Sequence, residues 1–222
     1  MAEALQMARL AVADGTDTMA ATPHRTWILR RSARPELVRE RVDELQAALN
    51  AAQIALTVVP GVEIKIGKRV ARDLLDKEIG TLGDVSRWAL LEPPFERIPL
   101  DALDNVKAVL DAGFQVVLAH PERCADIQRS LAFVEACADL GLAFQLTSGS
   151  LLGRFGPLAQ TTAEAILIHA ADWPLVIASD THDLTDRAPN LLSAARDAAA
   201  VFVGQTAAQD MVDARPRAMI SP

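Results

Sequence analysis

Apolar runs of five or six residues recur along the 222-residue chain, and amphipathic stretches separate them. The runs are continuous instead of alternating with polar residues, which is typical of parallel strands covered on both faces. The pattern predicts six strands, at residues 17–22, 54–59, 87–92, 114–119, 142–147 and 174–179. It also predicts helices at about 2–14, 35–52, 69–78, 101–112, 124–140, 158–171 and 190–200.

Strands that alternate with helices indicate an α/β fold built from βαβ units with right-handed crossovers. Gly15, Gly113 and Gly141 stand where three predicted helices should end, as C-cap glycines do. No linker rich in Gly, Ser or Pro divides the chain, so we expect a single domain over residues 1–222. Six strands are few for a closed (β/α) barrel and the chain begins with a helix, so a first strand is expected to be missing.

Composition narrows the classes of function. A net charge of −7 argues against a nucleic-acid or membrane-surface partner, because both select for basic faces. The two cysteines form no CxxC pair, which fits a reducing compartment and gives no zinc signature. The first helix carries Glu3, Arg9 and Asp14, unlike a signal peptide, and no run of 18 apolar residues occurs. We therefore expect a cytoplasmic protein without membrane insertion.

Histidines and carboxylates follow five of the six predicted strands. The active sites of βα barrels lie on the face where the carboxyl ends of the strands meet, so these side chains are expected to share one rim. Imidazole with carboxylate is the ligand set of Mn, Fe or Zn. The residues in these positions are His24, Glu63, Glu92, His120, Asp180 and His182. The fourth histidine, His169, lies near the end of a predicted helix and is interpreted as structural.

Three familiar catalytic or phosphate-binding motifs are absent from the sequence. Cys124 and Arg129 are separated by four residues, one fewer than the Cys-x5-Arg phosphate loop needs, and no glycine lies between them. The segment SGSLLG at 148–153 lacks the G-x-S-x-G frame of a nucleophile elbow, and we interpret it as a loop at the edge of the site. No GxxxxGK[ST] nucleotide loop occurs.

Six segments together carry a family resemblance: ATPH (21–24), GVEI (61–64), LLEPPF (90–95), AHPER (119–123), GSLLGRFG (149–156) and SDTH…R (179–187). These segments occur in this order along the chain, and through them the chain resembles the PHP (polymerase and histidinol phosphatase) superfamily. Within it, the chain is most similar to the bacterial manganese-dependent protein tyrosine phosphatases of capsule and exopolysaccharide synthesis. The resemblance implies a distorted TIM-like (β/α)7 barrel with up to three Mn2+ ions at its carboxyl face. It makes the six residues named above metal ligands, and Arg123 and Arg187 the groups that reach the phosphate.

By the same resemblance, the chain is expected to hydrolyse phosphotyrosine on a bacterial tyrosine kinase. Because phenolate, with a pKa near 10, is a tolerable leaving group, we expect direct in-line attack without a covalent intermediate. Two alternatives stay open: a small-molecule phosphatase like histidinol phosphatase, and a regulatory module that binds a kinase without catalysis. The chain departs from the family pattern at its start. The family opens with a strand that ends in His-x-His, and this sequence shows neither the strand nor the motif. We therefore expect fewer bound metals, and we expect an upstream extension that supplies this motif. A homo-oligomer is compatible with the sequence, which leaves the oligomeric state open.

Overall fold

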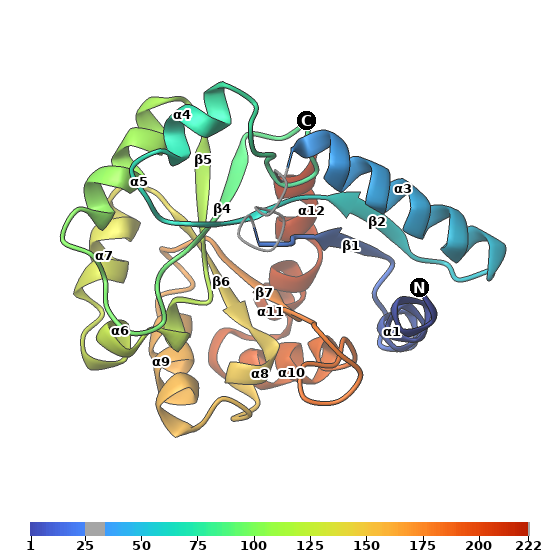
Figure 1. The fold of residues 1–222 in the computed structure, drawn as a ribbon. Helices are drawn as coiled ribbons and strands as arrows, with labels where there is room; N and C mark the ends of the chain where they lie inside the picture. The colour runs from blue at the N-terminus through green and yellow to red at the C-terminus, as the bar shows by residue number, and fades with distance from the viewer. Residues whose placement is uncertain (25–33, 222) are drawn as a thin grey trace.

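The structure is a computed structural model that describes residues 1–24 and 34–221 (Figure 1). Its strands are β1 (Thr18–Ala21), β2 (Thr57–Pro60), β3 (Glu63–Lys65), β4 (Trp88–Glu92), β5 (Gln115–Ala119), β6 (Ala143–Thr147) and β7 (Leu175–Ala178). Its helices are α1 (Ala2–Ala13), α3 (Pro35–Ala51), α4 (Val70–Leu75), α5 (Ala102–Asp111), η1 (Pro121–Arg123), α6 (Ala125–Arg129), α7 (Ala132–Asp139), α8 (Ser148–Leu151), α9 (Pro157–Leu167), α10 (Leu192–Val203), α11 (Gln205–Val212) and α12 (Ala214–Ile220).

The strands form two parallel sheets, which confirms the α/β class with a parallel sheet. One sheet pairs β1 with β2, and the other has the order β3-β4-β5-β6-β7. The pairing of β1 with β2 runs from Thr18 opposite Thr57 to Ala21 opposite Pro60. A bridge between His24 and Glu63 continues the same register past the end of β2. Because Glu63 begins β3, this bridge joins the small sheet to the large one.

The prediction of six strands was wrong, because the described ranges contain seven. The extra strand, β3, has three residues and follows β2 after only two. Its first residue is a buried glutamate, so it forms no separate apolar run in the sequence. Within the described ranges, no strand pairing joins β1 to β7. These two strands both line a cavity of about 730 Å3, so the paired strands form an open row here.

The C-terminal helix α12 spans the opening between β1 and β7. Arg215 donates a hydrogen bond of 3.0 Å to the carbonyl of Leu175, the first residue of β7. Arg217 binds both carboxylate oxygens of Asp17, just before β1, at 2.7 Å. Met219 is buried among apolar residues of β4, β5 and β7. The helix therefore ties together two edges that no described strand connects.

Helix boundaries were predicted well in the first half of the chain and less well after residue 120. Gly15, Gly113 and Gly141 have φ of +95°, +85° and +81°, which confirms the three helix C-caps. The helix predicted at 124–140 is instead α6 and α7, because Ser130 is extended and its hydroxyl accepts from the amide of Ala132. The loop predicted at 148–153 begins with the short helix α8, and α11 and α12 were not predicted.

The main core lies between the five-stranded sheet and the helices around it. Phe144, Leu118 and Leu91 are at most 1% exposed and belong to one apolar cluster. Helices α5, α7 and α9 lie on the outer side of this sheet, and α3 runs beside β2 (Figure 1). In the part of the chain that the structure describes, no helix is both long and apolar enough to cross a membrane.

Candidate active site

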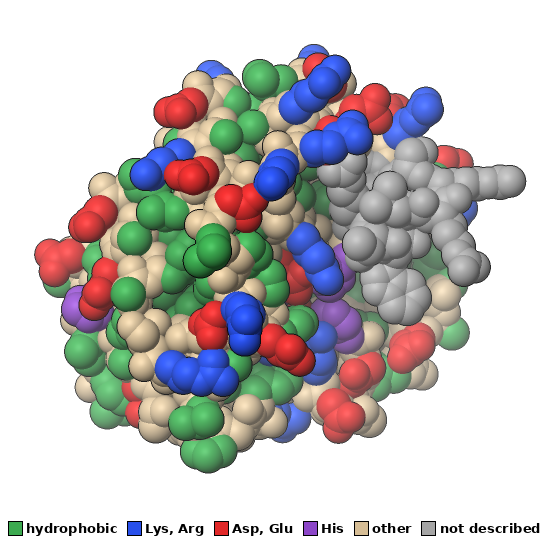
Figure 2. All heavy atoms as spheres, turned by 60° about the vertical axis from the view of Figure 1, so that its left-hand side comes forward, with side chains coloured by type: hydrophobic (Ala, Val, Ile, Leu, Met, Phe, Trp, Pro, Cys, Tyr) green, Lys and Arg blue, Asp and Glu red, His purple; other side chains and the backbone are tan. Residues whose placement is uncertain are grey.

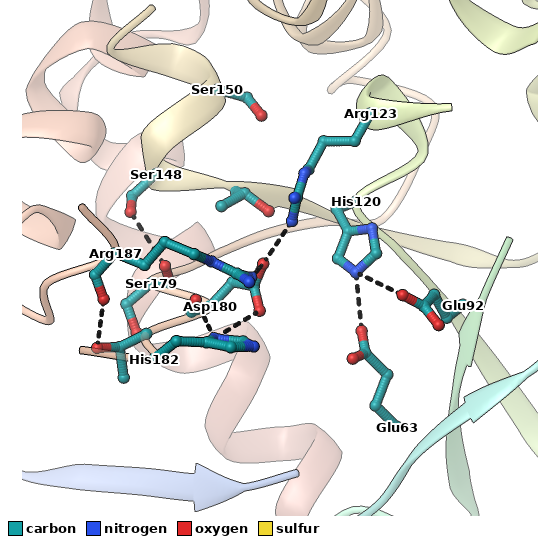
Figure 3. Close-up of polar contacts among 12 residues, drawn as sticks. Glu63, Glu92, His120, Arg123, Ser148, Ser150, Ser179, Asp180, His182 and Arg187 are labelled. Carbon is teal, nitrogen blue, oxygen red and sulfur yellow. Dashed lines mark hydrogen bonds and ion pairs between the residues drawn. The ribbon is translucent and has the colours of Figure 1, made fainter. Parts of the chain in front are cut away.

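The predicted site residues lie where the parallel strands end. Glu92 is the last residue of β4, and His120 follows β5 directly. Asp180 and His182 follow β7, and His24 follows β1. Figure 3 shows Glu63, Glu92, His120, Asp180 and His182 pointing into one region of the molecule. On the face drawn in Figure 2, histidine side chains reach the surface beside basic and acidic groups.

Three of these residues form a compact group. His24 Nε2 lies 3.0 Å from a carboxylate oxygen of Glu63 and 3.3 Å from one of Glu92. One ligand atom from each of the three lies within 4.8 Å of the others, which is close enough for all three to hold one metal ion. Glu63 and Glu92 are 5% and 2% exposed. Two buried carboxylates facing one another repel, so a bound cation would stabilise this arrangement.

His120 lies on the other side of Glu63. Its Nε2 is 2.8 Å from the second carboxylate oxygen of Glu63, and 3.8 Å from Glu92. The backbone of His120 has a φ of +33°, and its amide donates to the carbonyl of Gln145 in β6 at 2.8 Å. The left-handed turn directs the chain from β5 into η1, and it places His120 and Arg123 on the same rim.

The charges of Glu63 and His120 are coupled. Burial alone raises the pKa of Glu63, but the hydrogen bond and charge of His120 outweigh it and lower this pKa below its ordinary value. Burial lowers the pKa of His120, but the hydrogen bond and charge of Glu63 outweigh it and raise this pKa. Both directions favour a carboxylate facing an imidazolium, so a metal at this position would have to displace a proton.

A second group surrounds Asp180. Arg123 donates to one of its carboxylate oxygens at 2.9 Å, and Arg187 donates to the same oxygen. The imidazole Nδ1 of His182 lies 3.0 Å from the backbone carbonyl of Asp180. Asp180 and His182 lie outside the compact group of His24, Glu63 and Glu92. The structure thus brings the eight predicted residues to one rim as two neighbouring clusters.

A turn after β7 returns Arg187 to this rim. The carbonyl of Arg187 accepts from the amide of His182 at 3.0 Å and from the hydroxyl of Thr181 at 2.7 Å. The carboxylate of Asp183 accepts from the amides of Thr185 and Arg187. The spacing within SDTH…R is therefore the length of one tight loop. Asp180 itself has a φ of +48°, a conformation that non-glycine residues seldom adopt.

Several buried polar atoms of the site have no hydrogen-bond partner within residues 1–24 and 34–221. They are Glu92 Oε2, His120 Nδ1, Glu122 Oε2 and Arg187 Nε, together with the hydroxyl of Thr147. An unpartnered buried carboxylate oxygen is costly unless a cation or a donor meets it. The free oxygen of Glu92 therefore fits the role of a metal ligand, and the free N–H of Arg187 fits the role of an anion donor.

Glu122 is a site residue to which the sequence analysis gave no role. It is fully buried, and its Oε1 accepts from the amide of Thr147 at 2.9 Å and from Ser150 Oγ at 2.7 Å. Burial raises the pKa of this carboxyl. Glu122 thereby fastens η1, which carries Arg123, to the start of α8. Its place inside AHPER was the available signal, but its partners are more than twenty residues away.

Cys124 and His169 lie outside the two clusters of candidate site residues. Cys124 is 1% exposed, and burial raises the pKa of its thiol, which disfavours the reactive thiolate. His169 stacks on Trp173 with ring centroids 4.2 Å apart. It contributes to packing after α9, and it does not line the cavity beside the site.

The chain has relatives in both sequence and structure. It is 35% identical over 190 residues to the tyrosine-protein phosphatase YwqE of Bacillus subtilis. This alignment covers 84% of this chain and 72% of YwqE. It is 29% identical over 189 residues to CapC of Staphylococcus aureus, covering 83% of this chain and 71% of that protein. Both relatives are thus longer than the matched segment.

A solved structure shares the fold. It is one of the crystal structures of YwqE from Bacillus subtilis and CpsB from Streptococcus pneumoniae, which are described as unique metal-dependent tyrosine phosphatases. The TM-score is 0.89 at 30% identity, over 99% of this chain and 86% of that chain. Residues 1–221 also match the family described as "Capsular polysaccharide synthesis, CpsB/CapC". The match extends over nearly the whole chain, and the protein belongs to the CpsB/CapC family.

Proposed function

We propose that the chain is a metal-dependent protein tyrosine phosphatase. The observation that carries the proposal is the compact group of His24, Glu63 and Glu92, which lies next to two arginines that converge on Asp180. Membership of the CpsB/CapC family and similarity to YwqE, a named tyrosine-protein phosphatase, support the same reaction. In metal-assisted hydrolysis of a phosphate monoester, a cation binds phosphoryl oxygens and basic groups neutralise the rest of the charge.

The metal ligands in this proposal are His24, Glu63, Glu92, His120, Asp180 and His182. The donor set of imidazole and carboxylate suits Mn2+, which is the metal we propose. A divalent ion held there would polarise the phosphoryl oxygens and lower the pKa of water at neutral pH. The two clusters of ligands support more than one ion, and His24–Glu63–Glu92 is the group whose ligand atoms lie closest together.

Arg123 and Arg187 are the proposed phosphate-binding residues. Both donate to the same oxygen of Asp180, so each can direct its guanidinium to a single anionic atom on this rim. Guanidinium presents a planar fork of donors that matches phosphate oxygens. Phenolate has a pKa near 10, so tyrosine can leave without strong general-acid help. Direct in-line attack of water is therefore sufficient, with no covalent intermediate on Cys124.

The proposed substrate is the phosphorylated tail of a bacterial tyrosine kinase that regulates capsule or exopolysaccharide synthesis. The family description connects the chain to capsular polysaccharide synthesis. For the fold, we propose the distorted (β/α)7 barrel of the PHP type. It is supported by the seven parallel strands among the described residues and by β1 and β7, which line the same cavity.

The proposal is tested by assaying the metal-loaded chain on a phosphotyrosine peptide and on histidinol phosphate. We expect turnover with Mn2+ that favours the peptide, and loss of turnover with a chelator. Bound metal is measured alongside by atomic emission. Preference for histidinol phosphate would indicate a small-molecule phosphatase instead. A chain that binds no metal and hydrolyses neither compound would indicate a regulatory module.

A further inference from the structure

Arg123 contacts two phenylalanine rings in addition to Asp180. The central carbon of its guanidinium lies 4.8 Å from the ring centroid of Phe95 and 4.3 Å from that of Phe155. Both distances are inside the range of about 6 Å in which a cation is attracted to an aromatic face. A long flexible side chain that meets two rings loses much of its freedom, so these contacts restrict where the guanidinium lies.

The segment between α8 and α9 is built around the Phe155 ring. A Cβ added at Gly149 would lie only 2.7 Å from the edge of this ring, so the ring packs directly against the backbone of α8. Gly153 and Gly156 on either side of Phe155 have φ of +72° and +89°. Glycine is the residue that adopts such angles without strain. The glycines of GSLLGRFG thus make room for Phe155 and turn the chain so that its ring meets Arg123.

Phe95 has a different environment, because it is 46% exposed. Its ring stacks on the imidazole of His120, with centroids 5.6 Å apart and an interplanar angle of 15°. Its backbone carbonyl accepts from the amide of Ala125 at the start of α6, at 2.7 Å. The ring is therefore fixed at its base, next to a proposed metal ligand and a proposed phosphate-binding arginine, while a large part of its surface faces solvent.

We propose that Phe155 positions Arg123 for phosphate and that Phe95 binds the aromatic ring of the substrate. The proposal rests on the proposed function, since it names the residue that makes the site prefer aryl phosphates to alkyl phosphates. A phosphate bound by Arg123 lies beside the exposed Phe95 ring, and the group attached to that phosphate meets this ring. A phenyl group gains an aromatic contact there, and a short alkyl group gains little.

The experiment measures binding of two stable phosphonates to the Mn2+-loaded chain by titration calorimetry. Phenylphosphonate and methylphosphonate share the anionic head and differ in the ring, and neither has a hydrolysable ester bond. We expect the unchanged chain to bind phenylphosphonate about tenfold more tightly, which corresponds to an aromatic contact of ordinary strength. Phe95→Ala should reduce this preference to about threefold or less, and Phe95→Trp should retain it.

Phe155→Leu should have a different signature. It keeps apolar volume but removes the aromatic face from Arg123, so both phosphonates should weaken together by about three- to tenfold, with the preference for phenyl retained. Phe202→Ala is the matched control, because Phe202 is 45% exposed at the far end of α10. It should change neither affinity. Circular dichroism and bound metal, measured on each variant, separate these effects from misfolding.

The results distinguish this proposal from the proposed function. The role of Phe95 would be overturned if Phe95→Ala kept the full preference for phenylphosphonate, or if the wild-type protein showed no such preference. Equal binding by Phe155→Leu and the unchanged chain would overturn the role of Phe155, and absence of phosphonate binding would overturn both. A chain that prefers phenylphosphonate but does not hydrolyse a phosphotyrosine peptide would instead overturn the proposed function and leave the aromatic subsite intact.

Discussion

The two sheets of this protein differ in how deeply they are buried. Every residue of β6 is buried, whereas every residue of β1 is only partly buried. The proposed ligands follow the same division: the side chains of Glu92 and His120 are 3% and 2% exposed, and that of His24 is 24% exposed. The five-stranded sheet β3–β7, called the deep sheet below, therefore holds Glu92 and His120 in a protected position. The two-stranded sheet β1–β2, the shallow sheet, adds His24 from a less protected position.

Glu63 connects these two parts of the molecule. One of its carboxylate oxygens lies 3.0 Å from His24, and the other lies 2.8 Å from His120. The backbone of Glu63 also bridges to His24 and begins β3. The ligand group therefore forms only when the small sheet keeps its register with the large one. The comparison predicts that damage to the deep sheet affects the whole fold, and that damage at the junction affects the metal.

The largest effect is expected in the deep sheet. Phe144 in β6 is fully buried, and Phe144→Ala should lower the free energy of unfolding by about 3–5 kcal/mol because it leaves a cavity. Met19 in β1 is partly buried, so Met19→Ala should lower it by less than about 2 kcal/mol. Urea denaturation of both variants measures the difference. Equal losses would show that the two sheets unfold with the same protection.

The second prediction concerns the junction. Glu63→Gln removes the negative charge between His24 and His120, so bound Mn2+ should fall and kcat/KM should drop more than about 100-fold. Exposed Glu78→Gln is the control, and it should change neither quantity. Metal analysis and phosphotyrosine turnover provide the measurements. Full metal content with full turnover in Glu63→Gln would remove Glu63 from the ligand set.

The third prediction separates phosphate binding from metal binding. Arg123→Ala should lower kcat/KM by about 100-fold, because a positioned donor to the phosphoryl oxygens is lost, while bound metal stays nearly constant. Arg129→Ala is the control, since the Arg129 side chain is 72% exposed and pairs with nearby Asp126. If Arg123→Ala lost metal in proportion to turnover, its role would be structural.

The fourth prediction tests how α1 is tied to the rest. The carboxylate of Asp14, just after α1, accepts from the amides of Leu192 and Ser193 at 2.9 and 3.1 Å and thereby caps α10. Asp14→Ala should lower the free energy of unfolding by about 1 kcal/mol, the usual value of an N-cap. Asp14→Asn should recover part of this loss. If Asp14→Ala left the free energy of unfolding unchanged, the cap would add nothing measurable to stability.

The sequence predicted the features that depend on local pattern. Apolar runs located β4 to β7, and glycines at helix ends located three C-caps, because burial and backbone angle leave a signal at the residue itself. The candidate ligands were found in the same way, since each follows a predicted strand. Strand β3 was missed because three residues that begin with a glutamate do not resemble an apolar run.

Features that depend on distant partners could not be predicted. The ring of Phe155 matters because of Arg123, and Glu122 matters because of Thr147 and Ser150. None of these pairs has a helical or strand spacing. Asp14 caps a helix 178 residues away. Such contacts arise only when the fold brings the segments together, so neither periodicity nor a motif indicates them.

The smallest effect is expected at Cys124, which comes one residue after Arg123 and follows strand β5 of the deep sheet. Cys124 is 1% exposed and burial raises the pKa of its thiol, so little thiolate forms at neutral pH. Cys124→Ser should therefore leave kcat/KM on a phosphotyrosine peptide unchanged when equal amounts of folded protein are compared. Cys137→Ser is the matched control, because Cys137 is also buried and burial raises the pKa of its thiol to about 12. An alkylating reagent should not inhibit the unchanged chain, whereas a chelator should abolish its turnover. Turnover that survives the chelator but is lost with the reagent, or in Cys124→Ser alone, would establish a thiol mechanism and contradict the metal site at the junction of the two sheets.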